Sequence, residues 1–550
     1  MRRLWLLLPS ALFCIAAALS PERGELGVVA SDHVLASEAG AWVLEEGGNA
    51  VDAAVAAALA VSVVQPSAAG LGGGGFAVVV DGDERWVLDF REVAPAASHP
   101  ALFRDDAGEV IDGLSVDGGL AVAVPGEARG LMALHARRGQ LPLATVAKPA
   151  LRYAKRGFPA GHKLAAGLVK RPVMAEALFG LTSAPVQGAM LKRPRLHKAL
   201  KAFVASKGEA FHTGWVAEDL VAAARAAGGL ITLADLADYQ PTVREPLVGT
   251  YLDHTIITMP PPSSGGAVLL QVLGVLDGYD LDALGHGSSA YDHLLAEAFQ
   301  HAYADRAAFM GDPAFTDVPV DRMLSPERIE AVRASIHPAH TLDRDDYGSA
   351  VSIPEDAGTE HIAVIDASGL TVALTHTVNT GFGSKVVGPR SGVLLNNQMD
   401  DFVAKPGVPN TYGLIGREAN QVEAGKKPLS SMTPTVVLDP EGVPLMAVGA
   451  SGGPFIISST VQAIVNVLSF GMDLAEAVDA PRVHHQWVPE LLFVEPLAPI
   501  DVRAALEARG HTVRVFEHGS AVQAVMRVDD HFVGAADPRK DGRAAGARSF

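Results

Sequence analysis

The chain has 550 residues, of which 49% are hydrophobic, and its formal net charge is −18, with 56 glycines and 35 prolines. This length allows a large buried core and excludes a single small domain. A strongly acidic balance without a long basic run argues against nucleic acid or an anionic membrane surface as a partner.

The first twenty residues have the pattern of a secretory signal peptide. Arg2 and Arg3 precede an apolar run from Leu4 to Leu19, which is too short to cross a membrane as a helix. We therefore expect residues 1–20 to be removed, no membrane association afterwards, and a periplasmic or secreted protein. Cys14 is the single cysteine and lies in this run, so the remaining chain has no thiol for a disulfide or a nucleophile.

Residues 49–92 predict a buried helix, a glycine-rich run and two strands. The Ala/Val-rich helix begins at Asn49 and ends near Val64, and it is apolar on all sides. The run from Gly70 to Gly75 matches the spacing GxGxxG, but a helix precedes it and a strand follows, which is the reverse of a dinucleotide site. Arg91 ends the second strand, where it is either a surface charge or a fork for a carboxylate.

The middle of the chain predicts helices over residues 126–135, 216–225, 267–276 and 291–309, and a polar, exposed segment over 335–357. Residues 392–401 predict a strand that runs into a polar cluster. Residues 404–427 form a long loop rich in Pro, Gly and Asn, with Tyr412 inside it, and such loops often cover a site. A strand over 435–438, a helix over 455–468 and a tail of alternating strands and turns complete the expectation.

The stretch from Asp356 to Asn379 predicts a hairpin, because apolar and polar residues alternate on both sides of a three-residue loop that ends in Gly369. Pairing Asp366 with Leu370 places Thr359 opposite Thr377, with their Cβ atoms about 5 Å apart. A bulge at the loop would instead move the two threonines to opposite faces.

This hairpin has the geometry that an N-terminal threonine nucleophile needs. If the bond between Gly358 and Thr359 is cut, Thr359 gains an α-amine whose pKa of roughly 8 suits a general base. A threonine hydroxyl activated by its own amine is an established nucleophile. On these residues alone, an ordinary hairpin with two surface threonines is the simpler interpretation.

A second chemical interpretation rests on Gly449-Ala-Ser451-Gly-Gly453, which fits G-x-S-x-G between a strand and a helix. Ser451 would then be the nucleophile of an α/β-hydrolase, with Asp473, His484 or His485 recruited downstream. That fold needs a parallel sheet, which the segments after Leu468 do not predict. The same glycines could form an oxyanion hole at a helix start.

No HExxH motif occurs, and the pair His484-His485 reads as structural, so we expect neither a metal nor a cofactor.

The chain resembles the gamma-glutamyltransferase family of the N-terminal-nucleophile hydrolases, from about Val28 to Gly546. The resemblance rests on seven runs: Glu45–Ala54, Gly72–Phe76, Asp89–Glu92, Met259–Gly266, Leu394–Phe402, Pro428–Pro434 and Asp537–Gly542. It implies an α+β fold, a four-layer αββα sandwich, made as a precursor that cuts itself. Residues 21–358 would form the large subunit and residues 359–550 the small, catalytic subunit, and both would build one core.

The resemblance also implies the roles of individual residues. Thr359 is the nucleophile, Thr377 bonds its hydroxyl, and Gly452 and Gly453 are the oxyanion-hole glycines, which leaves Ser451 without a catalytic role. Tyr412 occupies the gating position of the lid. The donor's α-carboxylate would be held by Arg91, Ser430 and Ser431, and its α-amino group by Asn379, Gln398 and Asp401.

These expectations define a gamma-glutamyltransferase and glutathione hydrolase, with glutathione and other γ-glutamyl compounds as donors and amino acids or peptides as acceptors. A glutaryl or cephalosporin-type acylase on the same fold is the alternative, although a glutaryl group has no ammonium for Asp401 to meet. A binding protein that kept only the fold is a third possibility. Two positions depart from the family pattern, Glu360 after the nucleophile and Pro454 after the glycines, and Glu360 is expected to form a charge pair with His376.

Overall fold

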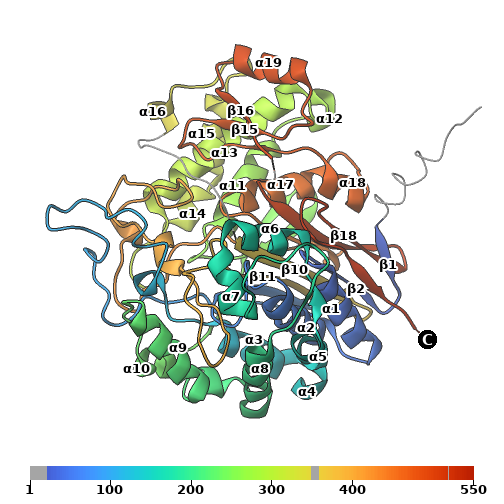
Figure 1. Ribbon diagram of the computed structural model, residues 1–550. Helices are drawn as coiled ribbons and strands as arrows, with labels where there is room; N and C mark the ends of the chain where they lie inside the picture. The colour runs from blue at the N-terminus through green and yellow to red at the C-terminus, as the bar shows by residue number, and fades with distance from the viewer. Residues whose placement is uncertain (1–20, 348–357, 518, 550) are drawn as a thin grey trace, which may run out of the picture.

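The computed structural model describes residues 21–347, 358–517 and 519–549. Two seven-stranded sheets stack face to face in the middle of the molecule, and helices cover both outer faces (Figure 1). The contacts of β10 and β11 with β13 join the two sheets. This arrangement confirms the predicted α+β class and its αββα layers. The expected signal peptide, residues 1–20, lies outside the described residues.

All neighbouring strands within the two large sheets pair antiparallel. This excludes the parallel sheet that an α/β-hydrolase would need. The first sheet has the order β1 (Glu22–Gly24), β18 (His531–Ala536), β17 (Ala521–Val528), β13 (Pro444–Ser451), β12 (Thr435–Leu438), β9 (His254–Thr258) and β8 (Leu247–Tyr251). The second has the order β19 (Ala545–Ala547), β2 (Gly27–Ser31), β10 (Gly358–Asp366), β11 (Thr371–Asn379), β3 (Gly74–Asp81), β4 (Glu84–Asp89) and β7 (Thr242–Arg244).

The helix that lies against β10 and β11 is α2 (Ala50–Val64), as the sequence predicts. Asn49 caps it, with a reciprocal hydrogen bond to Asp52, and all fifteen residues of the helix are buried. Its Ala and Val side chains have no polar face, so the helix is stable only where other elements cover it on every side. With it, α1 (Val34–Glu45), α3 (Glu127–Arg138) and α5 (Lys148–Arg156) form this layer.

The opposite helical layer consists of α11 (Gly265–Leu276), α13 (Ser289–Phe309), α17 (Phe455–Leu468) and α18 (Leu474–Asp479). The smaller helices are α4 (Leu143–Val146), α6 (His162–Lys170), α7 (Pro172–Phe179), α8 (Pro194–Ser206), α9 (Trp215–Ala226), α10 (Leu233–Asp238), α12 (Leu281–Leu284), α14 (Val320–Met323), α15 (Pro326–Ser335), α16 (Arg344–Tyr347) and α19 (Ile500–Ala508). The 3-10 turns are η1 (Gly119–Ala121), η2 (Glu209–Phe211), η3 (Gln398–Asp401) and η4 (Glu418–Asn420), and the minor strands are β5 (Phe158–Pro159), β6 (Met190–Leu191), β14 (Val483–His484), β15 (Leu492–Val494) and β16 (Val513–Val515).

The hairpin of β10 and β11 has the predicted register over most of its length. The amide of Asp366 donates to the carbonyl of Leu370, Gly369 takes a positive φ of 87°, and Glu360 lies opposite His376. The register shifts by one between Glu360 and Gly358, which lies opposite Asn379. The irregularity is therefore at the start of β10 and not at the loop.

Two predictions about secondary structure are wrong. Residues 392–401 form an isolated bridge at Leu394 and the 3-10 turn η3 instead of a strand. The Asn396 side chain instead bonds the backbone of Gly72 and Ala123, which lie far away in the sequence. The tail also contains two helices, α18 and α19, besides its strands.

Among the described residues, no helix combines the length and the apolar composition that crossing a membrane requires.

Candidate active site

A small cavity of about 30 Å³ lies between the end of the hairpin, the loop after β13 and the long loop over 404–427. Of the site residues that the sequence predicts, only Gly452 and the cleavage residue Gly358 are missing from its lining. The lining consists of Arg91, Thr359, Thr377, Asn379, Gln398, Asp401, Asn410, Tyr412, Leu414, Leu429, Ser430, Ser431, Met432, Gly453, Pro454 and Ile456.

Thr359 and Thr377 meet in this cavity. Their Oγ1 atoms lie 3.1 Å apart, and they lie 2.7 Å and 2.6 Å respectively from the carbonyl oxygen of Gly358. Thr377 Oγ1 also accepts the amide N–H of Asn379 at 2.8 Å. Both threonines are buried. The Thr359 hydroxyl is thus held beside the peptide bond that precedes it.

The shift at the start of β10 has a steric cause. A Cβ atom on Gly358 would lie 2.9 Å from the carbonyl of Thr380 and 3.0 Å from the carbonyl oxygen of Ser67. Only glycine fits there without moving the backbone. The close approach of these segments brings the carbonyl of Gly358 to the two threonine hydroxyls.

Lys540, for which the sequence predicts no role, contacts the backbone of Thr359 and does not line the cavity. Its Nζ donates to the carbonyl oxygen of Thr359 at 2.9 Å, to Asp32 Oδ2 at 2.8 Å and to Ser451 Oγ at 2.7 Å. Although burial favours the neutral amine, Asp32 keeps the pKa of Lys540 above its usual value. The residue lies in the run Asp537–Gly542, which marked the family resemblance but revealed no contact.

Ser451 is not placed as a nucleophile. It is fully buried at the end of β13, and its hydroxyl donates to Asp32 Oδ2 at 2.6 Å. No histidine bonds this hydroxyl; its other partners in the described chain are Lys540 and the carbonyl of Ala521. The serine-hydrolase alternative is therefore wrong in its site as well as in its fold.

Arg91 and Asp401 form an ion pair that lines the cavity. Arg91 is almost completely buried, and its Nε also donates to the carbonyl oxygen of Pro428 at 3.2 Å. Gln398 Nε2 donates to Asp401 Oδ2 at 3.1 Å. Burial raises the pKa of Asp401, and the adjacent guanidinium opposes that shift. The family resemblance assigns Arg91 to the carboxylate and Asp401 to the amino group of one ligand. The structure places the two side chains in direct contact with each other.

The remaining polar residues come from two loops that frame this pair. Asn379 adopts a positive φ of 80°, and its Nδ2 donates to the carbonyl oxygen of Asn397 at 3.0 Å. Ser430 Oγ accepts the amide of Met432 at 3.0 Å, so its hydroxyl proton is available to another acceptor. Ser431 also lines the cavity. The cavity therefore offers hydroxyl and amide groups around two opposite charges.

Gly452 and Gly453 connect β13 to α17 with positive φ angles of 132° and 57°. A Cβ atom on Gly453 would lie 2.9 Å from the ring of Tyr412, which packs directly over this glycine. The Tyr412 hydroxyl donates to the carbonyl oxygen of Asn379 at 2.9 Å. Tyr412 thus closes the cavity between the glycines and the hairpin.

The predicted charge pair between Glu360 and His376 is wrong. Both side chains are fully buried, and His376 Nδ1 lies 2.7 Å from Glu127 Oε1 of α3. Neither carboxylate oxygen of Glu360 has a hydrogen-bond partner in the described chain. Burial raises the pKa of Glu360 well above its usual value, and the nearby Asp32 adds to this shift. The register places Glu360 opposite His376, but the hydrogen-bond partner of His376 is Glu127 of α3.

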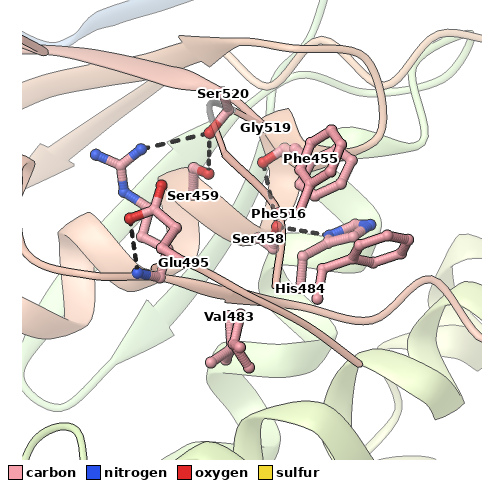
Figure 2. Close-up of a pocket in the computed structure, with 12 residues that line it drawn as sticks. Phe455, Ser458, Ser459, Val483, His484, Glu495, Phe516, Gly519 and Ser520 are labelled. Carbon is pink, nitrogen blue, oxygen red and sulfur yellow. Dashed lines mark hydrogen bonds between the residues drawn. The ribbon is translucent and has the colours of Figure 1, made fainter. Parts of the chain in front are cut away.

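A second small cavity, of about 20 Å³, lies behind the glycine loop (Figure 2). Figure 2 shows the rings of Phe455, His484 and Phe516 gathered on one side, and Ser459, Ser520 and Glu495 on the other. His484 Nδ1 lies 2.8 Å from Ser458 Oγ, and burial lowers the pKa of His484 to about 4. We assign this cavity to the packing of α17. Ser458, the serine that contacts His484, lies inside this helix, and Thr359 does not line the cavity.

The stacked antiparallel sheets, with Thr359 at the start of a central strand, define the class of N-terminal-nucleophile hydrolases. The family model of Gamma-glutamyltranspeptidase matches residues 36–547, and the chain belongs to this family. The glutathione hydrolase proenzyme of Escherichia coli (strain K12) is 38% identical over 530 residues, which covers 94% of this chain and 91% of that protein.

Two solved structures extend the comparison. The cephalosporin acylase from Bacillus halodurans superposes with a TM-score of 0.85 at 27% identity, over 96% of this chain and 97% of that chain. The gamma-glutamyltranspeptidase of Helicobacter pylori gives a TM-score of 0.54 at 38% identity, over 56% of this chain and 91% of that chain. The fold is therefore shared with an acylase, while the sequence is more similar to glutathione hydrolases.

Proposed function

We propose that this protein is a gamma-glutamyltransferase and glutathione hydrolase, which transfers a γ-glutamyl group to water, amino acids or peptides. One observation carries the proposal: a single cavity holds a paired threonine hydroxyl and a buried pair of opposite charges. The α-carbon of a γ-glutamyl donor bears a carboxylate and an ammonium, which match Arg91 and Asp401 in sign.

Donor binding replaces an internal ion pair with two external ones. The donor's carboxylate takes the guanidinium of Arg91 together with the hydroxyls of Ser430 and Ser431. Its ammonium takes Asp401, with Asn379 and Gln398 beside it. Arg91 and Asp401 are each also held by a neighbouring group, and the two new ion pairs with the donor offset the loss of the ion pair between them.

Maturation would cut the bond between Gly358 and Thr359. The Thr359 hydroxyl oxygen lies 2.7 Å from the carbonyl oxygen of Gly358, within reach of the carbonyl carbon after a small rotation. Oγ1 attacks that carbon, the C–N bond breaks, the nitrogen gains a proton, and water then opens the ester. The products are residues 21–358 as the large subunit and 359–550 as the small subunit, each contributing strands to both sheets.

Turnover would use the same hydroxyl. The new α-amine of Thr359 accepts the proton of Oγ1 as this oxygen attacks the donor's γ-carbonyl. The amides of Gly452 and Gly453 stabilise the oxyanion, and Thr377 orients the hydroxyl. The leaving amine takes the proton, and a γ-glutamyl ester of Thr359 remains. Water or an acceptor amine then attacks this ester and releases the threonine.

A glutaryl or cephalosporin-type acylase is the second candidate, because the Bacillus halodurans acylase shares the fold over almost the whole chain. The two activities differ at Asp401. A glutaryl group lacks the ammonium, so its binding would leave the buried carboxylate without a ligand partner.

We also propose that the protein reaches the periplasm or the exterior, which rests on the signal-peptide pattern of residues 1–20.

A paired substrate test separates the two candidates. The purified protein is given γ-glutamyl and glutaryl anilides of the same leaving group, and its intact mass is measured beforehand. We expect two chains that separate at Thr359 and a strong preference for the γ-glutamyl donor. A preference for the glutaryl anilide would replace the proposal with the acylase, and an uncut, inert chain would favour a binding protein.

A further inference from the structure

Helix α13 presents a histidine and a glutamate, one turn apart, to a histidine from the C-terminal part of the chain. His293 Nδ1 lies 2.7 Å from His511 Nε2. One ligand-type atom from each of His293, Glu297 and His511 lies within 4.8 Å of the other two, and all three residues are buried. His511 lies between α19 and β16, so the three side chains come from both sides of the Gly358–Thr359 bond.

A backbone contact fixes the orientation of His293. Its Nε2 lies 2.8 Å from the carbonyl oxygen of His337. A carbonyl oxygen only accepts, so Nε2 carries the proton and Nδ1 turns its lone pair toward His511. Metal-binding histidines generally have this second contact, which sets the tautomer and the ring plane.

Glu297 is a buried carboxylate surrounded by neutral donors. Its oxygens accept from Tyr347 OH at 2.5 Å, Thr341 Oγ1 at 2.7 Å and Gln300 Nε2 at 3.1 Å. Within the described part of the chain, no Lys or Arg forms an ion pair with it. A buried carboxylate held in this way is suited to a cation that the chain itself does not supply.

We propose that His293, Glu297 and His511 bind a divalent transition-metal ion, with Zn²⁺ as the favoured ion. Two imidazole nitrogens and one carboxylate oxygen are a zinc donor set, and a water completes the tetrahedron. Zn–N bonds of about 2.0–2.1 Å require the two nitrogens to separate by roughly half an ångström from their hydrogen-bonded distance. The ion takes the place of the hydrogen bond between the two imidazoles, and the proton of His511 moves from Nε2 to Nδ1, so that both rings remain neutral ligands.

The bound ion would tie α13 and the segment of Thr341 and Tyr347 to the C-terminal part of the chain. This inference does not depend on the proposed catalytic function.

Zinc retention tests the site directly. The purified mature protein is stripped with a chelator, dialysed against Zn²⁺ and passed through a desalting column, and its zinc is measured by elemental analysis. Wild type and the control His340→Ala, an exposed histidine outside the triad, should retain about one ion per molecule. His293→Ala and His511→Ala should each raise the zinc dissociation constant by more than about 100-fold.

Two further measurements guard against misfolded variants. Wild type loaded with Co²⁺ should show the visible absorption bands of a tetrahedral site, and excess Zn²⁺ should remove them. Tyr347→Phe removes one hydrogen bond from Glu297 and should weaken zinc binding by about 10-fold while the protein stays folded. Wild type that retains no more zinc than His511→Ala, or that gives no cobalt bands, would show that the three side chains form only a hydrogen-bonded cluster.

Discussion

Two sets of charged side chains lie near Thr359. They differ in how many of their polar atoms already have hydrogen-bond or ion-pair partners within the protein. In the Lys540 cluster (Lys540, Asp32, Ser451 and Gln523), the ammonium has three acceptors, and Asp32 accepts from the other three side chains. In the Arg91 pair (Arg91 and Asp401), both charges line a cavity. In the Lys540 cluster the charged groups are saturated with partners from the protein, so the cluster fixes the backbone at Thr359. The Arg91 pair lies beside a cavity, so each of its charges can exchange its partner for a group of a ligand.

The largest effect should come from Thr359, which lies between the two groups. Thr359→Ala should abolish both the chain cut and the turnover of γ-glutamyl anilide, because one hydroxyl serves both steps. Intact mass and a rate assay check this. Thr359→Ser keeps a hydroxyl and is the matched control, which should still be cut. An alanine variant that is cut at the same bond would contradict the mechanism.

Breaking the saturated cluster should affect stability first. Lys540→Met leaves Asp32 buried without its cation, and removing one partner of such a pair costs about 3–5 kcal/mol. Urea unfolding measures this difference. Lys198→Met, at an exposed lysine of α8, should change stability by less than about 0.5 kcal/mol. Equal effects of the two substitutions would mean that the cluster does not hold the fold together.

Breaking the exchangeable pair should affect donor binding first. Arg91→Lys keeps the charge but loses the two-pronged contact with a carboxylate. A lost charge-assisted hydrogen bond of about 1.5–3 kcal/mol corresponds to a KM higher by roughly 10- to 100-fold. Steady-state kinetics of the cut protein gives this value, and an unchanged KM would remove Arg91 from donor binding.

The pH profile sharpens the contrast, because Glu92 lies beside the Arg91 pair. Its carboxylate oxygen is 3.7 Å from Arg91 Nη1, and burial raises the pKa of Glu92 to about 8. Glu92 is therefore neutral below that pH and becomes an anion above it, where it competes with the donor's carboxylate. We expect KM to rise several-fold above about pH 8. In Glu92→Gln this rise should be smaller, and an identical rise would refute the competition.

The smallest effect on catalysis should come from Ser451. Ser451→Ala removes one member of the Lys540 cluster and should cost about 1–2 kcal/mol of stability. Activity should remain close to that of wild type, because Ser451 is buried and does not line the cavity that holds Thr359. Complete loss of turnover in a correctly cut protein would restore Ser451 as a catalytic candidate.

The sequence predicts the hairpin well because local rules govern it. Alternating residues and Gly369 set the loop and most of the register. The shift at Gly358 depends on Ser67 and Thr380, which approach only in the folded molecule. For the same reason the partner of His376 is Glu127, 249 residues away, and not the opposite residue.

The candidate site could be predicted residue by residue only through the family resemblance. Spacing alone does not reveal that Arg91 and Asp401, 310 positions apart, form an ion pair. The sequence shows Lys540 only as a member of a matched run, because its contacts come from β10, from β13 and from Asp32, the residue that follows β2. The strand prediction over residues 392–401 is wrong for a related reason. The Asn396 side-chain amide donates to backbone groups that are distant in the sequence, so the local pattern does not reveal these contacts.

The order of strands in the two sheets has a consequence for the cut protein. In the second sheet, β19, β10 and β11 follow the Gly358–Thr359 bond, while β2, β3, β4 and β7 precede it, and β2 lies between β19 and β10, so strands from the two sides of the bond are interleaved. If the chain is cut at this bond as proposed, the two pieces would share one interior and could not separate without unfolding. Refolding then becomes a bimolecular reaction, so the melting temperature should depend on protein concentration and heat inactivation should be governed by the rate of unfolding.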